Sequence, residues 1–319
     1  MQNLSPLVYV LVLNYCTYED TVACVNKIKK IEYDNYRVIV IDNKSPDGSG
    51  DRLSSVINPD EFIQFEKNLG YAGANNRGIE IALKNGADYI FVVNPDIRLE
   101  PCSMREYVQI MEANPEIGAL NPVQLSSPTG PVDQRFIASV LKGMVENEIF
   151  GKINSDLLLE VKTLFGASLF ISKGAIETVG GFDPLYFAYG EEEDFCRRLK
   201  YFNYKLAVTF KSPVIHLRNY NDQKINKFRD FLRLKGRYLF ILKDINREPL
   251  KCLKGFYYDL RADYFLHQEN KKSIFREVKY YKMFLWIFLN LTKIVASRNV
   301  EKKGFSHLAN KTFVTSAPK

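Results

Sequence analysis

The sequence predicts an α/β fold in which a mostly parallel sheet carries helices on both faces. Three short runs rich in valine and isoleucine are continuously apolar, as expected of strands buried on both faces: Val8–Asn14, Tyr36–Ile41 and Tyr89–Val93. Helix signals lie in the segments between these runs. A chain that alternates strands with helices typically builds a parallel sheet, and ligands of such sheets bind beyond the carboxyl ends of the strands.

The other elements follow in chain order. The first helix is predicted to begin near Thr17, because Thr17 and Asp20 form a Thr-x-x-Asp pattern close to a capping box, and to extend to about Lys30. Further helices are predicted over Gly73–Lys84, Ser103–Ala113 and Glu191–Phe202. Further strands are predicted over Glu61–Phe65, Leu164–Ser172 and Leu206–Phe210, with a Pro/Ser/Gly-rich loop over Asn121–Pro131 and a sharp turn over Gly180–Pro184.

Composition excludes several classes of protein. The 319 residues, 46% of them apolar, suffice for a large core and exclude a disordered chain, a collagen-like repeat and a disulfide-stapled miniprotein. No run of about 20 apolar residues occurs, so we expect no membrane-spanning helix. No basic region precedes an apolar stretch at the start, so we expect no signal peptide. The five cysteines lack metal-type spacing and indicate free thiols in a reducing cytosol.

Charge divides the chain into two segments. Residues 1–220 hold 22 Lys/Arg against 28 Asp/Glu, whereas residues 221–319 hold 22 against 9. We therefore predict a first domain over 1–220 and a helical, basic segment over 221–319. A basic surface of this kind suits an anionic membrane or a nucleic acid. A solvated helical face is the alternative.

Two segments after predicted strands suit a nucleotide. Asp42 ends the second strand and opens the block DNKSPDGS, where its carboxylate can accept hydrogen bonds from a base or ribose. The alternative is a plain Asx-rich turn. The segment 68–78 reads NLGYAGANNRG, and its glycines allow backbone to approach a ligand. It matches neither the GxxxxGK[ST] phosphate loop nor the GxGxxG dinucleotide fingerprint.

A candidate metal ligand follows the strand Tyr89–Val93. Asp96 lies in Asn94-Pro95-Asp96, and a hard carboxylate at this edge suits Mg²⁺ or Mn²⁺, with phosphates and waters completing an oxygen shell. The alternative is an aspartate that caps the next turn. His216 follows another predicted strand and is a second candidate ligand through a neutral ring nitrogen, with a structural histidine as the alternative.

The run Glu191–Asp194 places four acidic residues behind Gly190. Their mutual repulsion costs stability, and a helix N-terminus offsets only part of this cost. A carboxylate whose pKa is raised in this way is a natural general base. A solvated acidic first turn is the alternative, but the apolar flanks Leu185–Phe187 and Phe195 favour a partly buried site.

Together, in this order and spacing, these motifs resemble family 2 inverting glycosyltransferases of the GT-A fold. The resemblance spans about residues 7–220 and rests on VYVLVLNY, the block at Asp42, NLGYAGANNRG, Asn94-Pro95-Asp96, Val179–Asp183, and the acid run followed by Cys196-Arg197-Arg198. It is strongest for rhamnosyltransferase-like and galactofuranosyltransferase-like members of bacterial surface polysaccharide synthesis. It implies that the donor nucleotide is contacted by Asp42, Asn43, Asn68, Gly70, Gly73, Asn76 and Asn94.

The resemblance also implies a mechanism. Asp96 matches the last residue of the DxD metal motif, whose first aspartate is replaced by Asn94, and with His216 it would hold Mg²⁺ or Mn²⁺. Glu192 matches the catalytic base, with Glu191 as the fallback. Asp194 would position the acceptor or the helix. The base would deprotonate an acceptor hydroxyl, and one displacement would invert the anomeric configuration.

The predicted function is transfer of rhamnose or another hexose from a dTDP- or UDP-sugar to a saccharide acceptor carried on a lipid diphosphate. The aromatic, basic runs 256–265 and 280–295 suit the interface of an anionic membrane, so we expect a cytoplasmic protein held peripherally at the inner face of the cell membrane. Packing on the catalytic domain or on a second subunit in a homodimer is the alternative. Competing functions are an inactive nucleotide-sugar-binding scaffold and a nucleic-acid-binding protein; nothing in residues 1–220 serves nucleic acid.

Overall fold

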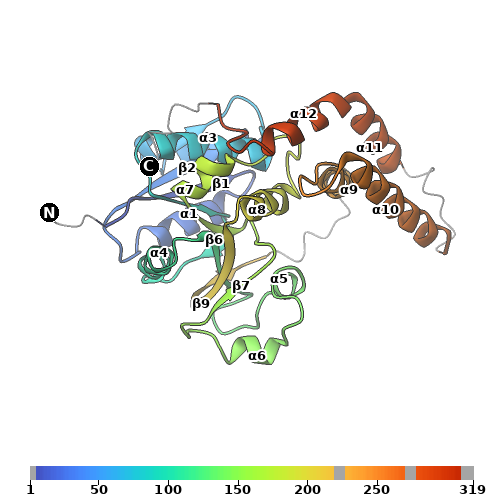
Figure 1. The fold of residues 1–319 in the computed structure, drawn as a ribbon. Coiled ribbons are helices and arrows are strands. Elements are labelled where there is room, and N and C mark those ends of the chain that lie inside the picture. Colours follow the sequence, from blue (N-terminus) through green and yellow to red (C-terminus); the bar gives the residue numbers. More distant parts are fainter. Residues whose placement is uncertain (1–4, 219–226, 270–277, 310–319) are drawn as a thin grey trace.

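The computed structural model describes residues 5–218, 227–269 and 278–309 (Figure 1). Within these residues a nine-stranded sheet has the order β3-β2-β1-β4-β8-β6-β9-β5, and β7 pairs with β9. The strands are β1 (Val8–Asn14), β2 (Tyr36–Asp42), β3 (Phe62–Gln64), β4 (Tyr89–Val93), β5 (Ile97–Arg98), β6 (Ile117–Leu125), β7 (Leu158–Glu160), β8 (Ser168–Ser172) and β9 (Lys205–His216).

The three runs that predict the fold form the centre of its parallel part. Strand β1 pairs in parallel with β2 on one side and with β4 on the other, so Val8 lies beside both Tyr36 and Tyr89. The same register places Asn14 beside Asp42 at the carboxyl ends of β1 and β2. The short strand β3 extends the parallel pairing beyond β2, and β6 and β9 form another parallel pair. The predicted mostly parallel sheet is confirmed.

Antiparallel strand β8 joins the two parallel parts, because it pairs with β4 on one side and β6 on the other. The loop predicted over Asn121–Pro131 is wrong in its first half, where β6 continues to Leu125. Every residue of β6 is buried, and the register shift between Pro122 and Gln124 is an irregularity that accommodates a residue without a backbone N–H. Strand β9 likewise extends past the predicted Leu206–Phe210 to His216.

Helices cover both faces of the sheet, as predicted. Val8, Val10 and Val12 contribute to one apolar core, which includes residues of α1 (Tyr18–Ile28), α2 (Ser49–Ser54) and α4 (Ser103–Ala113). Tyr9 and Leu11 point to the opposite face and join the core that contains residues of α3 (Gly70–Lys84), α7 (Lys173–Val179) and α8 (Glu191–Tyr201). The period of two along β1 therefore divides the interior into two layers. The short helices α5 (Gln134–Ser139) and α6 (Glu146–Phe150) lie between β6 and β7 in the chain.

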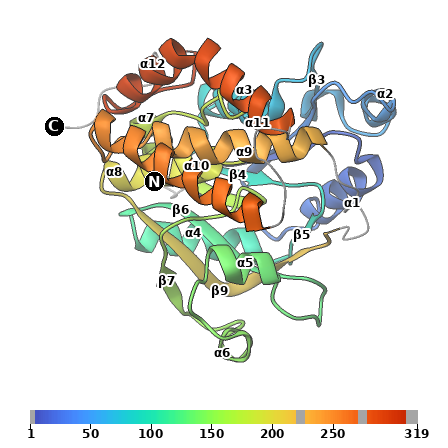
Figure 2. The ribbon, with the colours of Figure 1, turned by 90° about the vertical axis from the view of Figure 1, so that its right-hand side faces the viewer.

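The basic segment forms the predicted helices: α9 (Lys227–Leu242), α10 (Pro249–Glu269), α11 (Val278–Leu289) and α12 (Leu291–Glu301). They gather on one side of the molecule, which faces the viewer in Figure 2. A third apolar core joins them to the sheet-containing part of the chain through Tyr186, which is fully buried with Tyr238 and Leu239 of α9. After α12 the chain returns to this part, where Ser306 pairs with Gly180 in a β-bridge.

Candidate active site

Asp42 is the centre of a buried hydrogen-bond cluster at the ends of β1 and β2. It accepts hydrogen bonds from Asn14 Nδ2 at 2.7 Å, Ser45 Oγ at 2.6 Å and the Ser45 backbone N–H at 3.1 Å. This geometry is that of the Asx turn left open by the sequence, and it orders the loop that follows β2. A contact between Asp42 and the nucleoside base stays a prediction.

Helix α1 begins directly after Thr17, as predicted, but Asn14 takes the hydrogen bond that a capping side chain would make. The Thr17 side chain makes no hydrogen bond to the N-terminal N–H groups of α1, because its hydroxyl donates to Asn14 Oδ1 at 3.0 Å instead. Asn14 therefore ties the start of α1 to the loop after β2. Its position as the last residue of a buried strand was the available signal for this role.

A second cluster holds the loop before α3. Asn43 Nδ2 donates to Asn68 Oδ1 at 3.0 Å and to the Gly70 carbonyl at 3.1 Å, while its own Oδ1 accepts from the Leu69 N–H at 2.8 Å. Gly70 has φ +71°, and a Cβ there would collide with the Phe187 carbonyl. That carbonyl accepts from the Ala72 N–H at 3.2 Å. The glycine-rich loop thus packs directly on the loop that leads into α8.

Two further predicted donor contacts differ in their surroundings. Gly73 lies in the first turns of α3, where a Cβ would lie 3.0 Å from Leu69 Cβ. Asn76 is buried, and its amide is occupied: Nδ2 donates to the carbonyls of Phe182 at 2.7 Å and His307 at 3.0 Å, and Oδ1 accepts from the Phe182 N–H at 2.8 Å. The structure does not bring Asn76 into the Asn43–Asn68 cluster. Its amide instead fastens α3 to the Gly180–Pro184 turn and to the C-terminal segment.

Asp96 and His216, which are 120 positions apart in the sequence, meet at the edge of the sheet. Strands β5 and β9 pair Ile97 with His216, which brings His216 Nε2 to 3.2 Å from Asp96 Oδ2. Burial opposes the ionisation of Asp96, but the hydrogen bond and charge of His216 outweigh it, so the pKa of Asp96 is lowered. Asn94 lies at the start of the same turn, and its backbone N–H donates to the Ala167 carbonyl at 2.8 Å.

The contact of the other ring nitrogen, Nδ1, fixes the orientation of the His216 ring toward Asp96. Nδ1 lies 2.8 Å from Gln124 Oε1, and the Gln124 amide nitrogen donates to Ser168 Oγ at 3.1 Å. With this amide orientation Nδ1 donates to Gln124 Oε1, so the ring is held with Nε2 toward Asp96. Nε2 donates to the carboxylate when the ring is protonated, and it offers a lone pair to a metal ion when the ring is neutral.

The Asp96–His216 pair fits a divalent ion. Two ligands at right angles around an octahedral ion, each at about 2.1 Å, lie about 3 Å apart. The observed separation of 3.2 Å is close to this value. Asp133 and Arg218, which the sequence reasoning missed, form an ion pair with each other beside this pair, and Asp133 Oδ2 lies 3.9 Å from His216 Nδ1. The acidic N-cap position of Asp133 before α5 was the only local signal for it.

The acid pair Glu191–Glu192 opens helix α8. Glu191 is buried and Glu192 half-buried, and within the described residues one carboxylate oxygen of each makes no hydrogen bond. Burial and the neighbouring Glu192 raise the pKa of Glu191 well above its ordinary value. Burial raises the pKa of Glu192 to about 7. A carboxyl whose pKa is about 7 can accept or release a proton near neutral pH.

Asp194 has different surroundings from the acid pair. It is fully buried and pairs with Arg197 Nη2 at 2.5 Å and Arg198 Nε at 2.9 Å, and Nζ of Lys243, the residue directly after α9, lies 3.7 Å away. These cations outweigh burial and hold the pKa of Asp194 far below its usual range. Of the two roles implied for Asp194, its contacts favour positioning of the helix.

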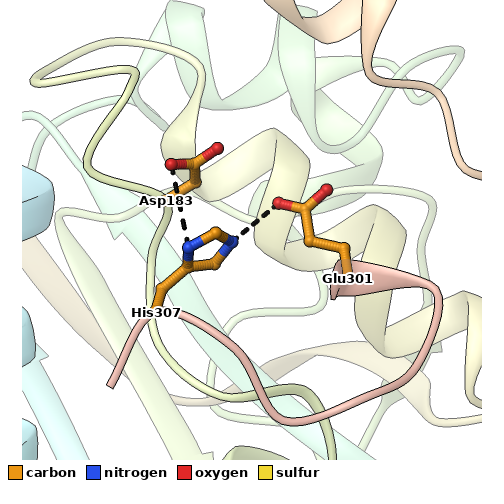
Figure 3. A group of neighbouring side chains, drawn as sticks. All are labelled: Asp183, Glu301 and His307. Carbon is orange, nitrogen blue, oxygen red and sulfur yellow. Dashed lines mark hydrogen bonds and ion pairs between the residues drawn. The ribbon is translucent and has the colours of Figure 1, made fainter. Parts of the chain in front are cut away.

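A related network joins the C-terminal helices to the catalytic domain. His307 lies between Asp183 and Glu301, with Nε2 2.8 Å from Glu301 Oε1 and Nδ1 3.8 Å from Asp183 Oδ1 (Figure 3). The arrangement has the donor types of a metal site. Lys243, directly after α9, is however fully buried and pairs with both carboxylates, so an ammonium already supplies the positive charge.

A few contacts connect the acid pair with the glycine-rich loop and with the turn that contains Asp96. Tyr71, next to Gly70 on α3, donates its hydroxyl to the Gly166 carbonyl at 2.7 Å and interacts electrostatically with both Glu191 and Glu192. Residue 167, adjacent to Gly166, accepts the Asn94 N–H. Contacts thus link three features along one edge of the sheet, where ligands of α/β sheets bind: the turn that contains Asn94 and Asp96, the glycine-rich loop, and the acid pair.

Comparisons with known proteins agree with this geometry. The family model for glycosyl transferase family 2 matches residues 8–172. The low-salt glycan biosynthesis hexosyltransferase Agl10 of Haloferax volcanii is 22% identical over 70% of this chain and 80% of its own. The N-acetylglucosaminyl-diphospho-decaprenol L-rhamnosyltransferase of Mycobacterium tuberculosis is 25% identical over 76% of this chain and 87% of its own.

Among solved structures, the mannosyltransferase PcManGT from Pyrobaculum calidifontis, in complex with GDP-Man and Mn²⁺, superimposes with a TM-score of 0.53 at 16% identity, covering 92% of this chain and 79% of its own. This likeness supports the GT-A fold expected from the sequence. The family model spans about half of the chain and includes the strands that carry Asp42 and Asp96 at their ends. The chain belongs to glycosyl transferase family 2.

Proposed function

We propose that this protein is an inverting, metal-dependent hexosyltransferase that uses a dTDP- or UDP-sugar, with rhamnose as the first candidate. The observation that carries the proposal is the placement of the Asp96–His216 pair and the Glu191–Glu192 pair along one edge of the sheet. The relative from M. tuberculosis is named as an L-rhamnosyltransferase, and PcManGT was solved with a nucleotide sugar and Mn²⁺. The first name supports rhamnose as the transferred sugar, and the second supports a nucleotide-sugar donor.

The metal-side residues act on the leaving group. Asp96 and His216 would hold Mg²⁺ or Mn²⁺, which, when bound, neutralises the charge that develops on the departing nucleoside diphosphate. The Asn43–Asn68–Gly70 cluster fixes the backbone of the glycine-rich loop against which the nucleotide would rest. Asp42 orders the loop after β2 on the same side.

Glu192 acts on the acceptor. Its unpartnered carboxylate oxygen accepts the proton of an acceptor hydroxyl, and the hydroxyl oxygen bonds to the anomeric carbon as the bond to the diphosphate oxygen breaks. Attack from the face opposite the diphosphate inverts the anomeric configuration without a covalent enzyme intermediate. Burial raises the pKa of Glu192 to about 7, which suits it to act as a base near neutral pH.

The acceptor is a saccharide on a lipid diphosphate, as the name of the M. tuberculosis relative suggests. The outer faces of α10 to α12 suit such an acceptor because large apolar side chains are exposed there, at helical spacing: Leu250, Leu253, Tyr257, Tyr258, Tyr281, Leu285, Phe288 and Leu289. Lysines are exposed among them: Lys251, Lys254, Lys282 and Lys293. Apolar side chains with lysines between them match the interface of an anionic bilayer.

Membrane contact would be peripheral, at the inner face of the cell membrane. In the described parts of the chain, none of the helices has the length and apolarity needed to cross a bilayer. Phe256, Tyr280, Phe284 and Trp286, which the sequence groups with the membrane-contacting aromatics, instead pack in the third core between the helices. The side chains of Tyr264 and Phe265 lie outside the described residues.

A donor screen tests the activity. The purified chain is incubated with dTDP-rhamnose and a panel of UDP-hexoses, with Mn²⁺ or Mg²⁺, with and without a polyprenyl-diphosphate-linked saccharide. We expect acceptor-dependent release of nucleoside diphosphate that chelation abolishes, and a product of inverted anomeric configuration by NMR. Tight donor binding with no transfer to any acceptor would instead identify an inactive nucleotide-sugar-binding protein, and a retained configuration would refute the single displacement.

A further inference from the structure

Lys235 lies on the inner side of α9, beside the loop that leads into the acid pair. The side chain is 4% exposed, its Nζ donates to the Leu185 carbonyl at 3.0 Å, and the Trp286 ring of α11 lies 4.6 Å from Nζ. Burying an ammonium group is costly unless opposite charge compensates for it. The compensating charges are those of Asp183 and Glu191, with which Lys235 interacts electrostatically.

Helix α9 holds this ammonium in place by direct backbone contact. A Cβ on Gly236 would collide with the Tyr189 carbonyl, and a Cβ on Gly190 would come within 3.4 Å of Gly236 Cα. Two glycines therefore face each other where α9 meets the start of α8. The loop before Gly190 contains two non-glycine residues in the left-handed region, Phe187 at φ 66° and Tyr189 at φ 70°. Such a backbone persists only when the surrounding structure over-determines it, as α9 does here.

Lys235 differs from the other charged and titratable groups around the acid pair in its effect on ionisation. The charges of Glu192 and Glu193 oppose ionisation of Glu191, and the pair in turn raises the pKa of Tyr71, while Glu192 also interacts with Cys196. The positive charge of Lys235 favours ionisation of Glu191. Burial lowers the pKa of Lys235 to about 8, so its charge is present at neutral pH and is lost above that value.

We propose that Lys235 is a positioning residue of the transfer reaction: held beside the start of α8 by the Gly236–Gly190 contact, it supplies the positive charge that favours the carboxylate form of the Glu191–Glu192 pair, which accepts the acceptor proton. The proposal rests on the proposed function. It also gives α9 a role beyond attaching the C-terminal helices, since this helix carries the buried ammonium that interacts electrostatically with Glu191. No proton passes through Lys235 itself; the base takes one proton from the acceptor and releases it to solvent after the product leaves.

The pH dependence of turnover tests this role in four proteins: wild type, Lys235→Met, Lys235→Arg and the control Lys227→Met, which removes an exposed lysine from the same helix. At pH 6.5, relative to its own maximum, Lys235→Met should lose about three- to tenfold more activity than wild type, because the pair holds its proton more tightly without the ammonium. Lys235→Arg, which keeps the positive charge, should keep the acidic limb of wild type. An unmoved acidic limb in Lys235→Met overturns the proposal. If that variant does not fold, the same comparison is made with Lys235→Gln, and an acidic limb equal to that of wild type overturns the proposal.

A second measurement needs no transferase activity. In protein labelled with ¹³C at the lysine ε-carbon, the Lys235 signal is assigned by its loss in Lys235→Arg, and its titration is followed in wild type and in Glu191→Gln. We expect the midpoint to move to lower pH in Glu191→Gln, because the favourable carboxylate charge is gone. An unmoved midpoint overturns the proposed contact. A moved midpoint in a protein that transfers no sugar leaves the contact standing and refutes the proposed function instead.

Discussion

Arg198 Nε donates a 2.9 Å hydrogen bond to Asp194 Oδ2 from one turn further along α8, and neither side chain is exposed to solvent. Arg198 also donates to the carbonyls of Val179 at 2.9 Å and Gly181 at 2.7 Å, so the pair fastens α8 to the Gly180–Pro184 turn. The acidic run at the start of α8 is therefore divided. Its last member is neutralised by three cations, whereas Glu191 and Glu192 remain short of partners.

Asp194→Asn should destabilise the protein rather than alter its chemistry selectively. Asp194 is the carboxylate that Arg197, Arg198 and Lys243 all contact, and removing one charge from such a buried network typically costs about 3–5 kcal/mol. Urea unfolding of this variant, compared with Glu193→Gln one position earlier on the exposed side of α8, provides the measurement. A variant as stable as Glu193→Gln but inactive would show that Asp194 acts on the substrate.

Glu192→Gln should lower turnover by roughly 10²–10⁴-fold with little change in donor affinity. Glutamine keeps the size of the side chain but cannot accept the acceptor proton, and this is the usual contribution of a general base. Steady-state kinetics and donor titrations separate the two effects, with Glu193→Gln as the matched control. If Glu192→Gln stays active while Glu191→Gln is inactive, the base is Glu191.

The same variant should change how stability depends on pH. Burial raises the pKa of Glu192 from 4.5 to about 7, so between these values the folded protein binds more protons than the unfolded chain, and the free energy of unfolding falls as pH rises. Glutamine has no charge to bury. Glu192→Gln should therefore melt at a higher temperature than wild type at pH 8 and at nearly the same temperature at pH 4.5. Equal melting temperatures at both pH values would mean that Glu192 is solvated.

Asp96→Asn should abolish the gain in nucleoside-diphosphate affinity that Mn²⁺ provides. The substitution removes the carboxylate charge that faces His216 Nε2 at 3.2 Å, and an amide is a much weaker ligand for a hard cation. Calorimetric titration of UDP and dTDP, with and without Mn²⁺, measures the loss. Glu100→Gln, an exposed acid four residues on, is the control. Metal-dependent affinity that survives in Asp96→Asn and in His216→Ala would place the metal elsewhere.

Membrane binding should depend on the outer face of α11. Phe288 and Leu289 are 76% and 67% exposed, so replacing both with serine leaves the packed core untouched. It also removes apolar surface whose transfer from water into the bilayer interface would contribute about 3 kcal/mol or more to binding. We expect co-sedimentation with phosphatidylglycerol vesicles to fall at least tenfold. Phe150 on α6 is also exposed, at 51%, and the control variant Phe150→Ser should bind the vesicles like wild type.

Surface substitutions test membrane binding more specifically than a truncation does. Deleting α11 and α12 would also remove Glu301, whose carboxylate pairs with the buried Lys243. Two results would contradict the membrane proposal. One is equal co-sedimentation of the double variant and wild type. The other is a wild-type dimer, by light scattering, that does not bind vesicles and that the double variant converts to a monomer; the outer face would then cover a second copy of the chain.

Local patterns determined much of this protein. Apolar periodicity and residue types a few positions apart predict the strand that begins at Val8, the helix over Ser103–Ala113 and the acid run that opens α8. The order of the motifs along the chain also indicated the family and the fold. These features depend on short-range sterics and burial, and a single sequence contains that information.

Tertiary structure alone decided which polar side chains meet and in what state of charge. The pairing of Asp96 with His216 depends on the register of β5 on β9, and the different surroundings of Glu192 and Asp194 depend on cations brought by α8 and α9. The continuation of β6 through Pro122 depends on burial between β8 and β9. Because a pKa depends on all charges and the burial within several ångströms, and such neighbours come from distant parts of the chain, residue spacing contains no record of it.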